Sequence, residues 1–343
     1  MSMSSLISQT GVGTGPESET SHHIVCLEEC HCPIPAFSFP HTYSGYDSTP
    51  PSPSEITARL QDATIAITTI VPIPPEVLPS CPRLQCVIVM ATGVEWVDVP
   101  AFKERGIRVL NCPGANVGSV AEHAIALYFA SRRKTVELHN AIMTDGGANQ
   151  EWRTKRTLTH RFSGPPHTTR QEVVAVVGYG AVGKRVETVV RALGMQVLVA
   201  ERKGVMGADV REGRVAFETA LQHATVLIVS ATKNRETVGL IGEVELAGMR
   251  SDALVINVAR GGVVDESALA KALKQGVIAG AATDVFDGEP PARGQSVLLE
   301  DVPNLTVSPH IAWFSESTIR NLQDMLVEGM EGFVEGNLVN IVC

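Results

Sequence analysis

The chain has 343 residues, which is long enough for two domains of ordinary size, each with its own hydrophobic core. Its formal net charge of −9 and the lack of a long apolar run argue against nucleic acid or a membrane as partners. The N-terminal residues lack a basic segment followed by an apolar one, and the seven scattered cysteines favour reduced thiols, so we expect a cytoplasmic location and no metal site.

The N-terminal third of the chain changes from a polar tail to an alternating pattern. Residues 1–21 are rich in Ser, Gly and Thr and are predicted to be disordered. Residues 40–54 are rich in Pro and Ser, which predicts a loop that leads into a short helix. Apolar, β-branched runs at 63–70, 84–91 and 107–112 then predict strands.

The pattern after residue 118 begins with a long helix. Residues 119–143 predict this helix, with Ser119 as its cap and Glu122 completing a capping box, and residues 150–171 are polar and irregular. A second series follows, with predicted strands at 173–177, 196–200, 225–230, 253–258, 278–283 and 304–307 and helices at 181–193, 266–274 and 315–335. Strands that alternate with helices are typical of βαβ units, so the predicted class is α/β with parallel sheets.

The stretch "GYGAVG" follows a predicted strand directly and opens a predicted helix. Its glycines, Gly178, Gly180 and Gly183, have the spacing of a dinucleotide-binding loop. The first glycine permits a tight turn, the second lets the backbone approach a pyrophosphate, and the third lets the helix pack on the strand. The helix N-terminus then offers unpaired N–H groups to the phosphates. The pattern therefore predicts a dinucleotide cofactor.

Glu201 ends the second strand of this unit and bears on which dinucleotide binds. A carboxylate at that place accepts hydrogen bonds from the ribose hydroxyls and repels a 2′-phosphate, which favours NAD. Its neighbours Arg202 and Lys203 have the opposite charge and would attract a 2′-phosphate. We therefore expect NAD as the preferred cofactor, with NADP as the alternative.

Three charged groups follow the dinucleotide-binding glycine loop at 178–183, here called the cradle. Each lies just past the end of a predicted parallel strand. They are Arg260, an acidic loop with Asp284 and Glu289, and His310 in "SPHIAW". That edge is where open α/β sheets bind ligands. An Arg fork can clamp a carboxylate, and a carboxylate beside an imidazole holds it in the charged form. A single His is more often structural, but beside a dinucleotide cradle His310 is interpreted as a proton donor.

From about residue 60 to residue 340 the sequence resembles the D-isomer-specific 2-hydroxyacid dehydrogenases. The resemblance is carried by "NCPGANVGSVAEHA", "GYGAVG", "NVARGGVVDE", "DVFDGEP" and "SPHIAW", in the order and at the spacing of that family. It implies that Arg260, Glu289 and His310 are catalytic. It also implies two Rossmann-like, doubly wound domains with a cleft between them.

The resemblance further implies a domain layout and a set of contacts. Residues 22–115 with 310–343 would form a substrate-binding domain, and 116–309 an inserted NAD(P)-binding domain that forms a homodimer through the helix starting at Ser119. The backbone amides of Thr92, Gly93 and Val94 would bind the substrate carboxylate together with Arg260 and His310. The expected cofactor contacts, beyond the glycines, are Ala181, Val182, Glu201, Arg202, Ser230, Ala231, Val258, Ala259 and Asp284.

Trp313 makes the sequence similar to the glycerate dehydrogenase and hydroxypyruvate reductase branch of this family. The expected substrate is therefore a short 2-oxo acid, glyoxylate or hydroxypyruvate, reduced to the D-2-hydroxy acid. A reductase for bulkier 2-oxo acids is one alternative. An NAD-sensing interaction protein of the corepressor type is another, although the chain lacks a long C-terminal tail. A third is a pseudoenzyme whose N-terminal segment blocks the cleft.

Overall fold

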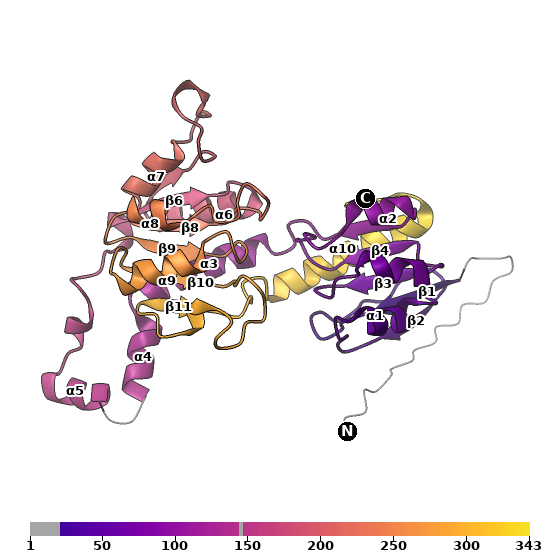
Figure 1. Ribbon diagram of the computed structural model, residues 1–343, viewed down its shortest axis with the longest axis horizontal. Coiled ribbons are helices and arrows are strands. Elements are labelled where there is room, and N and C mark those ends of the chain that lie inside the picture. Colours follow the sequence, from indigo (N-terminus) through magenta and orange to yellow (C-terminus); the bar gives the residue numbers. More distant parts are fainter. Residues whose placement is uncertain (1–20, 144–146) are drawn as a thin grey trace. The chain divides into compact units, whose positions relative to one another are not determined.

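The structure, a computed structural model, describes residues 21–143 and 147–343, and the described chain forms two compact units (Figure 1). The first contains the described residues up to Asn116 together with Ser315–Cys343, and the second contains Val117–Phe314. Residues 310–314 thus pack with the second unit, whereas the predicted boundary placed them in the first. The disorder predicted for residues 1–21 falls outside the described residues, apart from Ser21. The functions assigned to the units stay predictions.

The first unit is built on a five-stranded parallel sheet in the order β2-β1-β3-β4-β5. The predicted loop at 40–54 is wrong over its first part, because β2 pairs there with β1 in register from His22 and His41 onward. Neither segment has the long apolar run that signals a strand. The strands are β1 (His22–Cys26), β2 (His41–Gly45), β3 (Ile65–Thr68), β4 (Cys86–Val89) and β5 (Arg108–Asn111).

Helices cover both faces of this first sheet. Alternate residues such as Val87 and Val109 face the side that buries Ile56 of α1 and Phe102 of α2. On the other side α10 (Glu316–Glu335), whose range agrees with the helix predicted at 315–335, lies against β4. Ser315 caps α10, because its hydroxyl accepts a hydrogen bond from the Thr318 N–H at 3.1 Å. The other helices are α1 (Pro53–Leu60), the 3₁₀ turn η1 (Pro75–Ser80) and α2 (Val99–Glu104).

The second unit contains a six-stranded parallel sheet in the order β11-β10-β9-β8-β6-β7. The chain starts in the interior at β6, goes to one edge with β7, and returns to the other side of β6 with β8. The carboxyl ends of β6 and β8 therefore form a switch point, the place where such sheets bind ligands. The strands are β6 (Val173–Val177), β7 (Gln196–Val199), β8 (Val226–Val229), β9 (Leu254–Asn257), β10 (Gly280–Thr283) and β11 (Leu305–Val307).

Successive residues of β6 face opposite cores of this second sheet. Val174 and Val176 pack with α3 and α6, whereas Ala175 and Val177 pack with α7, α8 and α9. Because both faces are covered, the strands are apolar throughout, as the sequence predicts for a parallel sheet. The helices are α3 (Val117–Arg132), α4 (Thr135–Met143), α5 (Gly147–Lys155), α6 (Ala181–Ala192), α7 (Phe217–His223), α8 (Glu243–Ala247) and α9 (Glu266–Lys274), with 3₁₀ turns η2 (Thr159–Arg161), η3 (Thr169–Gln171), η4 (Gly207–Asp209) and η5 (Val297–Leu299).

The single helix predicted at 119–143 is wrong in two respects. It is two helices, α3 and α4, because Lys134 adopts a positive φ of 48° that interrupts the helical backbone. α3 also begins at Val117, so Ser119 lies inside the helix, where it is buried rather than capping. The segment 150–171, predicted to be irregular, contains the end of α5 and the short turns η2 and η3.

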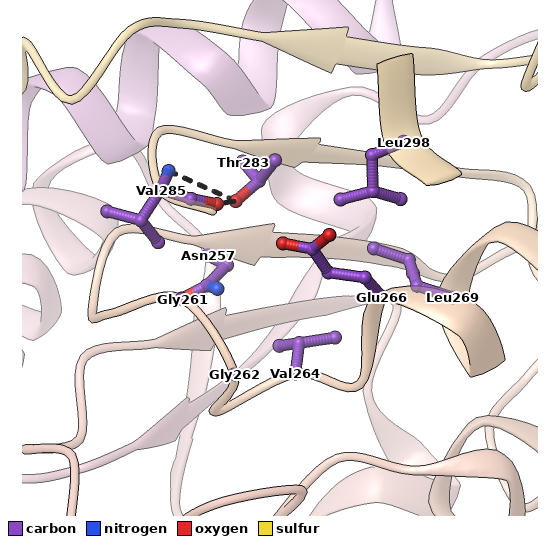
Figure 2. A pocket seen from close by; sticks show the side chains of 9 residues that line it. All are labelled: Asn257, Gly261, Gly262, Val264, Glu266, Leu269, Thr283, Val285 and Leu298. Atoms are coloured by element: carbon purple, nitrogen blue, oxygen red, sulfur yellow. Dashed lines mark hydrogen bonds between the residues drawn. The ribbon is translucent and has the colours of Figure 1, made fainter. Parts of the chain in front are cut away.

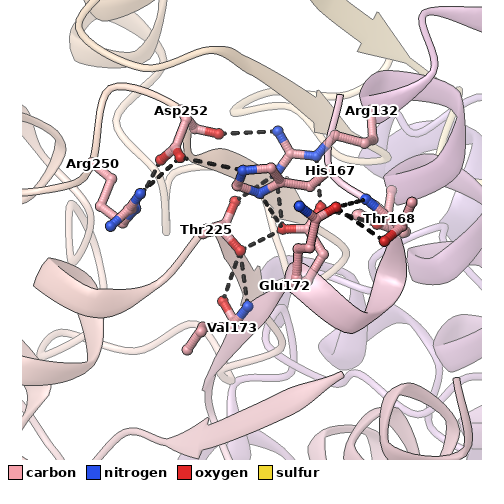
Figure 3. Close-up of polar contacts among 10 residues, drawn as sticks. Arg132, His167, Thr168, Glu172, Val173, Thr225, Arg250 and Asp252 are labelled. Atoms are coloured by element: carbon pink, nitrogen blue, oxygen red, sulfur yellow. Dashed lines mark hydrogen bonds and ion pairs between the residues drawn. The ribbon is translucent and has the colours of Figure 1, made fainter. Parts of the chain in front are cut away.

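A buried ion pair ties the sheet to α3 at the edge opposite the switch point (Figure 3). Arg132 donates to both carboxylate oxygens of Glu172, from Nε at 2.7 Å and from Nη2 at 3.0 Å. The hydroxyls of Tyr128 and Thr225 also donate to Glu172, which is fully buried. Removal of one partner from such a pair typically costs about 3–5 kcal/mol. This cluster therefore has a structural role at the amino ends of β6 and β8.

Among the helices of the described residues, none is both long enough and apolar enough to cross a membrane.

Candidate active site

The turn after β6 is closed by a direct contact with the chain that follows β8. Gly178 has a φ of +89°, and a Cβ at this position would lie 2.4 Å from the backbone nitrogen of Ala231. The Ser230 hydroxyl donates to the Gly178 carbonyl at 2.7 Å. The structure thus brings Gly178, Ser230 and Ala231 together at the switch point, where cofactor contacts were predicted.

Gly183 and Gly180 are glycines for different reasons. A Cβ on Gly183 would lie 2.2 Å from the Gly178 carbonyl oxygen, so the packing of α6 on the turn requires its absence. A Cβ on Gly180 would meet no described atom within 4 Å, and its φ of −85° suits any residue. None of the described residues therefore requires glycine at 180, and the open space is what an approaching pyrophosphate needs.

The N-terminus of α6 faces this open space with backbone donors. The first intrahelical hydrogen bond runs from Lys184 N to the Gly180 carbonyl at 3.0 Å. The N–H groups of Ala181, Val182 and Gly183 precede that bond and point out of the helix start. They offer hydrogen bonds and the positive end of the helix dipole to an anion. The residues present therefore fit a dinucleotide pyrophosphate.

Arg260 and the acidic loop follow two adjacent strands, and the backbone beside Arg260 contacts the loop. Arg260 follows β9, and the acidic loop follows β10. Gly261 packs so closely on this loop that a Cβ would lie 1.8 Å from the Phe286 carbonyl oxygen. Val258 and Ala259, predicted as cofactor contacts, are buried just before Arg260. The packing fixes the spacing between the Arg260 turn and the loop that carries Glu289.

Asp284 is buried and holds the segment that carries His310. Its carboxylate accepts hydrogen bonds from the backbone N–H groups of Ile311 at 3.0 Å and Ala312 at 2.9 Å, and from the Ser308 hydroxyl at 2.6 Å. Burial raises the pKa of Asp284, but the hydrogen bonds from His123, Ser308 and these amides outweigh it and hold the pKa below its usual value. Asp284 was predicted to contact the cofactor, and the anchoring role is an additional one that the sequence did not reveal.

His310 and Glu289 form a hydrogen-bonded pair through His310 Nδ1 and Glu289 Oε2. The other carboxylate oxygen of Glu289 accepts the Phe286 N–H at 2.7 Å. His310 has a φ of 51°, a backbone conformation that is uncommon outside glycine and often marks a functional position. Its side chain is 42% exposed, and among the described residues its Nε2 has no hydrogen-bond partner. The pair can therefore present a proton on Nε2 to a bound molecule.

The sequence matches the family model of the D-isomer specific 2-hydroxyacid dehydrogenase NAD-binding domain over residues 125–312, which contain the cradle and this pair. The chain belongs to the D-isomer-specific 2-hydroxyacid dehydrogenase family. The resemblance seen in the sequence and the predicted fold of two doubly wound parallel-sheet units are thereby confirmed.

Relatives of this 2-hydroxyacid dehydrogenase align over most of their length. It is 37% identical to a glycerate dehydrogenase of Methylorubrum extorquens, over 92% of this chain and 96% of the relative. A hydroxypyruvate reductase of Blautia hydrogenotrophica is 31% identical, over 84% of this chain and 87% of the relative. The solved structure of an NADPH-dependent glyoxylate/hydroxypyruvate reductase from Sinorhizobium meliloti shares the fold, with a TM-score of 0.76 at 24% identity, over 94% of this chain and 98% of that one.

Glu201 of this dehydrogenase is buried beyond β7 and is already hydrogen-bonded. Arg211 Nε donates to it at 2.7 Å and the Arg202 N–H at 2.8 Å, and Arg214 lies 3.7 Å away. The hydrogen bonds from Arg211, which outweigh the opposing effect of desolvation, lower the pKa of Glu201 to about 2. Arg211 was not predicted, because it comes ten residues later in the chain and no motif marks it.

The predicted substrate loop lies in the first unit, directly after β4. The Thr92 hydroxyl donates to the Cys112 carbonyl at 3.2 Å, and the Thr92 carbonyl accepts from Asn111 Nδ2 at 2.9 Å. These bonds hold the turn of Thr92, Gly93 and Val94 against the end of β5. Because Arg260 and His310 lie in the second unit, the joint substrate site stays a prediction.

A small pocket lies behind the Arg260 turn, between β9, β10 and the start of α9 (Figure 2). Figure 2 shows the Glu266 side chain in its centre, with Leu298 and Val264 on either side. The Glu266 carboxylate accepts hydrogen bonds from the loop that carries Glu289. Glu266 is the last residue of the motif "NVARGGVVDE", and no role was predicted for it.

Proposed function

We propose that this enzyme reduces a short 2-oxo acid, glyoxylate or hydroxypyruvate, to the D-2-hydroxy acid, and that NAD is its preferred cofactor. The chain is an oxidoreductase that uses a nicotinamide cofactor, as its family membership establishes. The observation that carries the proposal is the His310–Glu289 pair in the same unit as the glycine cradle. The names of the relatives, a glycerate dehydrogenase and a hydroxypyruvate reductase, support the substrate class.

When bound, the reduced nicotinamide supplies a hydride to C2 of the 2-oxo acid. His310 Nε2 would give its proton to the oxygen on C2, so that the carbonyl group gains one hydride and one proton. Glu289, bonded to Nδ1, would orient the ring. Arg260 would bind the substrate carboxylate and the amides of Thr92, Gly93 and Val94 would share it. Charge stabilisation of the developing alkoxide would be the larger contribution to the rate.

A panel of 2-oxo acids, assayed with NADH and with NADPH, tests this function. We expect the highest kcat/KM for glyoxylate and hydroxypyruvate, because the family branch and Trp313 favour small substrates. Higher kcat/KM for branched or aromatic 2-oxo acids would overturn the substrate assignment but leave the reaction type in place. No turnover of any 2-oxo acid would overturn the proposed function itself.

The cofactor preference is proposed to depend on Glu201 and on the arginine that it binds. We expect a higher kcat/KM with NADH than with NADPH, and Glu201→Ala should shift the preference toward NADPH, because it removes a charge that repels a 2′-phosphate. Arg211→Ala should have the opposite effect, since the freed carboxylate can accept the ribose hydroxyls. A change of about 1.4 kcal/mol in the binding free energy corresponds to a tenfold change in Kd.

Calorimetry with 5′-ADP and 2′,5′-ADP measures this preference without turnover. The ratio of the two Kd values should move in opposite directions in Glu201→Ala and Arg211→Ala. A wild type that prefers 2′,5′-ADP, together with an unchanged ratio in Arg211→Ala, would show that Arg202 and Lys203 determine the preference instead.

Glu289→Gln should lower kcat/KM for glyoxylate without weakening cofactor binding. The Glu289 carboxylate bonds to His310 Nδ1 and orients the ring, and Gln keeps the size of the side chain but removes its charge. The measurement is kcat/KM for glyoxylate reduction together with the Kd of NADH, in wild type and in the variant. An unchanged kcat/KM would contradict the coupling of Glu289 to His310.

A homodimer through the second unit and a cytoplasmic location are proposed from the family resemblance and from the cysteines. The exposed apolar side chains on α3, α4 and α5 support the dimer: they are Phe129, Val136, Met143 and Trp152. Sedimentation of the purified protein should give twice the mass of the chain, and a monomer at micromolar concentration would refute the dimer.

A further inference from the structure

Glu266 begins α9, and its carboxylate binds the loop that carries Glu289. The Asp287 N–H donates to Glu266 Oε1 at 2.6 Å, and the Ser296 hydroxyl donates to Glu266 Oε2 at 2.5 Å. Ser296 is buried, with 3% of its surface exposed. Short hydrogen bonds to an ionised carboxylate are about twice as strong as neutral ones. Glu266 therefore binds the loop at two points, Asp287 and Ser296, on either side of Glu289.

The Asp287 amide lies next to the two groups that the proposed reaction uses. The preceding residue, Phe286, donates its N–H to Glu289, and its carbonyl packs against Gly261 of the Arg260 turn. On its other side the loop is held by Glu266. A shift of the peptide that joins Phe286 and Asp287 would move Glu289 relative to His310.

Another contact of this loop, the ion pair of Asp287 with Lys233, is at the surface. Asp287 pairs with Lys233 at 3.0 Å, but the Asp287 side chain is 63% exposed. Exposed ion pairs contribute about 0–1 kcal/mol, so this pair restrains the loop weakly. Glu266 instead accepts two hydrogen bonds from the loop, and the one from the buried Ser296 hydroxyl is partly shielded from water. Glu266 is thus the stronger restraint of the two.

We propose that Glu266 is a positioning residue, which sets the place of Glu289 against His310 through the Asp287 amide and the Ser296 hydroxyl. The proposal rests on the function proposed above for that pair. The competing explanation is that Glu266 only stabilises α9 as an acid in the first turn of a helix. A purely helical role predicts a loss of thermal stability without any change in the behaviour of His310.

The first experiment compares Glu266→Gln with Asp265→Asn. Both variants remove one negative charge from the start of α9, and Asn keeps the cap that Asp265 provides to the Ala268 N–H. In Glu266→Gln, kcat for glyoxylate reduction should fall by up to about 100-fold, the effect of displacing a reacting group by about 1 Å. Asp265→Asn should keep the wild-type kcat and pH profile.

The second readout requires no turnover. In the cofactor-free protein, NMR at a single pH records the imidazole signals of His310, assigned by comparison with His310→Gln. These signals should move in Glu266→Gln, toward their position in Glu289→Gln, and stay at the wild-type position in Asp265→Asn. The other charged groups near the pair are unchanged in both variants: Lys233, Arg260, Asp284, Asp287 and His123. Unchanged His310 signals in Glu266→Gln overturn the proposal even if the enzyme has another substrate.

A double-mutant cycle decides whether Glu266 acts through Glu289. If it does, adding Glu266→Gln to Glu289→Gln should lower kcat little further, because the orientation is already lost. Effects that multiply in the double variant would overturn the proposal. If Glu266→Gln fails to fold, Ser296→Ala takes its place, since it removes one of the two bonds and keeps the carboxylate. Its His310 NMR signals should move in the same direction, and wild-type signals there count against the proposal.

Discussion

His310→Gln is expected to lower kcat for glyoxylate reduction by about 10²- to 10⁴-fold, the usual contribution of a positioned general acid. Gln is similar in size and keeps a hydrogen-bonding group near Glu289, but it has no proton to give at neutral pH. The Kd of NADH should be unchanged, because the cradle is formed by the turns after β6 and β8 and not by His310. Stopped-flow turnover and calorimetry measure the two quantities separately.

The control for this variant is His223→Gln at the end of α7, where the ring is exposed and bonds to the Thr219 carbonyl at 2.8 Å. Its kcat should equal that of wild type. A His310→Gln enzyme that retains wild-type kcat would reject His310 as the proton donor. A loss of NADH binding in the same variant would show that His310 shapes the cofactor site instead.

Gly180→Val is expected to raise the Kd of NADH at least about 100-fold, or about 2.7 kcal/mol. The branched side chain would fill the space that the pyrophosphate needs, whereas the protein itself has room for it, since no described atom lies within 4 Å of a Cβ there. The protein should therefore stay folded, apart from a loss of about 1 kcal/mol because Val is a poor helix cap. Calorimetry gives the Kd, and thermal unfolding gives the stability.

Gly183→Ala provides the matched contrast, because a Cβ there would lie 2.2 Å from the Gly178 carbonyl oxygen. This variant should lose stability in the absence of any cofactor, which Gly180→Val should not do to the same extent. If NADH binds Gly180→Val as it binds wild type, the assignment of the cradle to the pyrophosphate is wrong.

The sequence alone was sufficient for features that depend on a few neighbouring residues. The glycine loop was predicted because each glycine meets a local requirement of a strand, turn and helix in succession. Arg260, Glu289 and His310 were placed at one sheet edge because parallel strands bring their carboxyl ends to the same side. The predicted range of α9 was right because its cap and apolar periodicity lie within the helix itself.

The tertiary structure decided what depends on residues far apart in the chain. β2 is a strand because β1 supplies its hydrogen bonds, although its own sequence resembles a loop. The break between α3 and α4 depends on the backbone of a single lysine, which hydrophobic periodicity does not reveal. Arg211 donates a hydrogen bond to Glu201, and the Asp287 N–H donates one to Glu266. Both contacts form because the parallel sheet brings loops that are distant in the sequence next to one another. Local patterns specify which groups stand at the sheet edge, but which of them bond to each other depends on packing between distant segments.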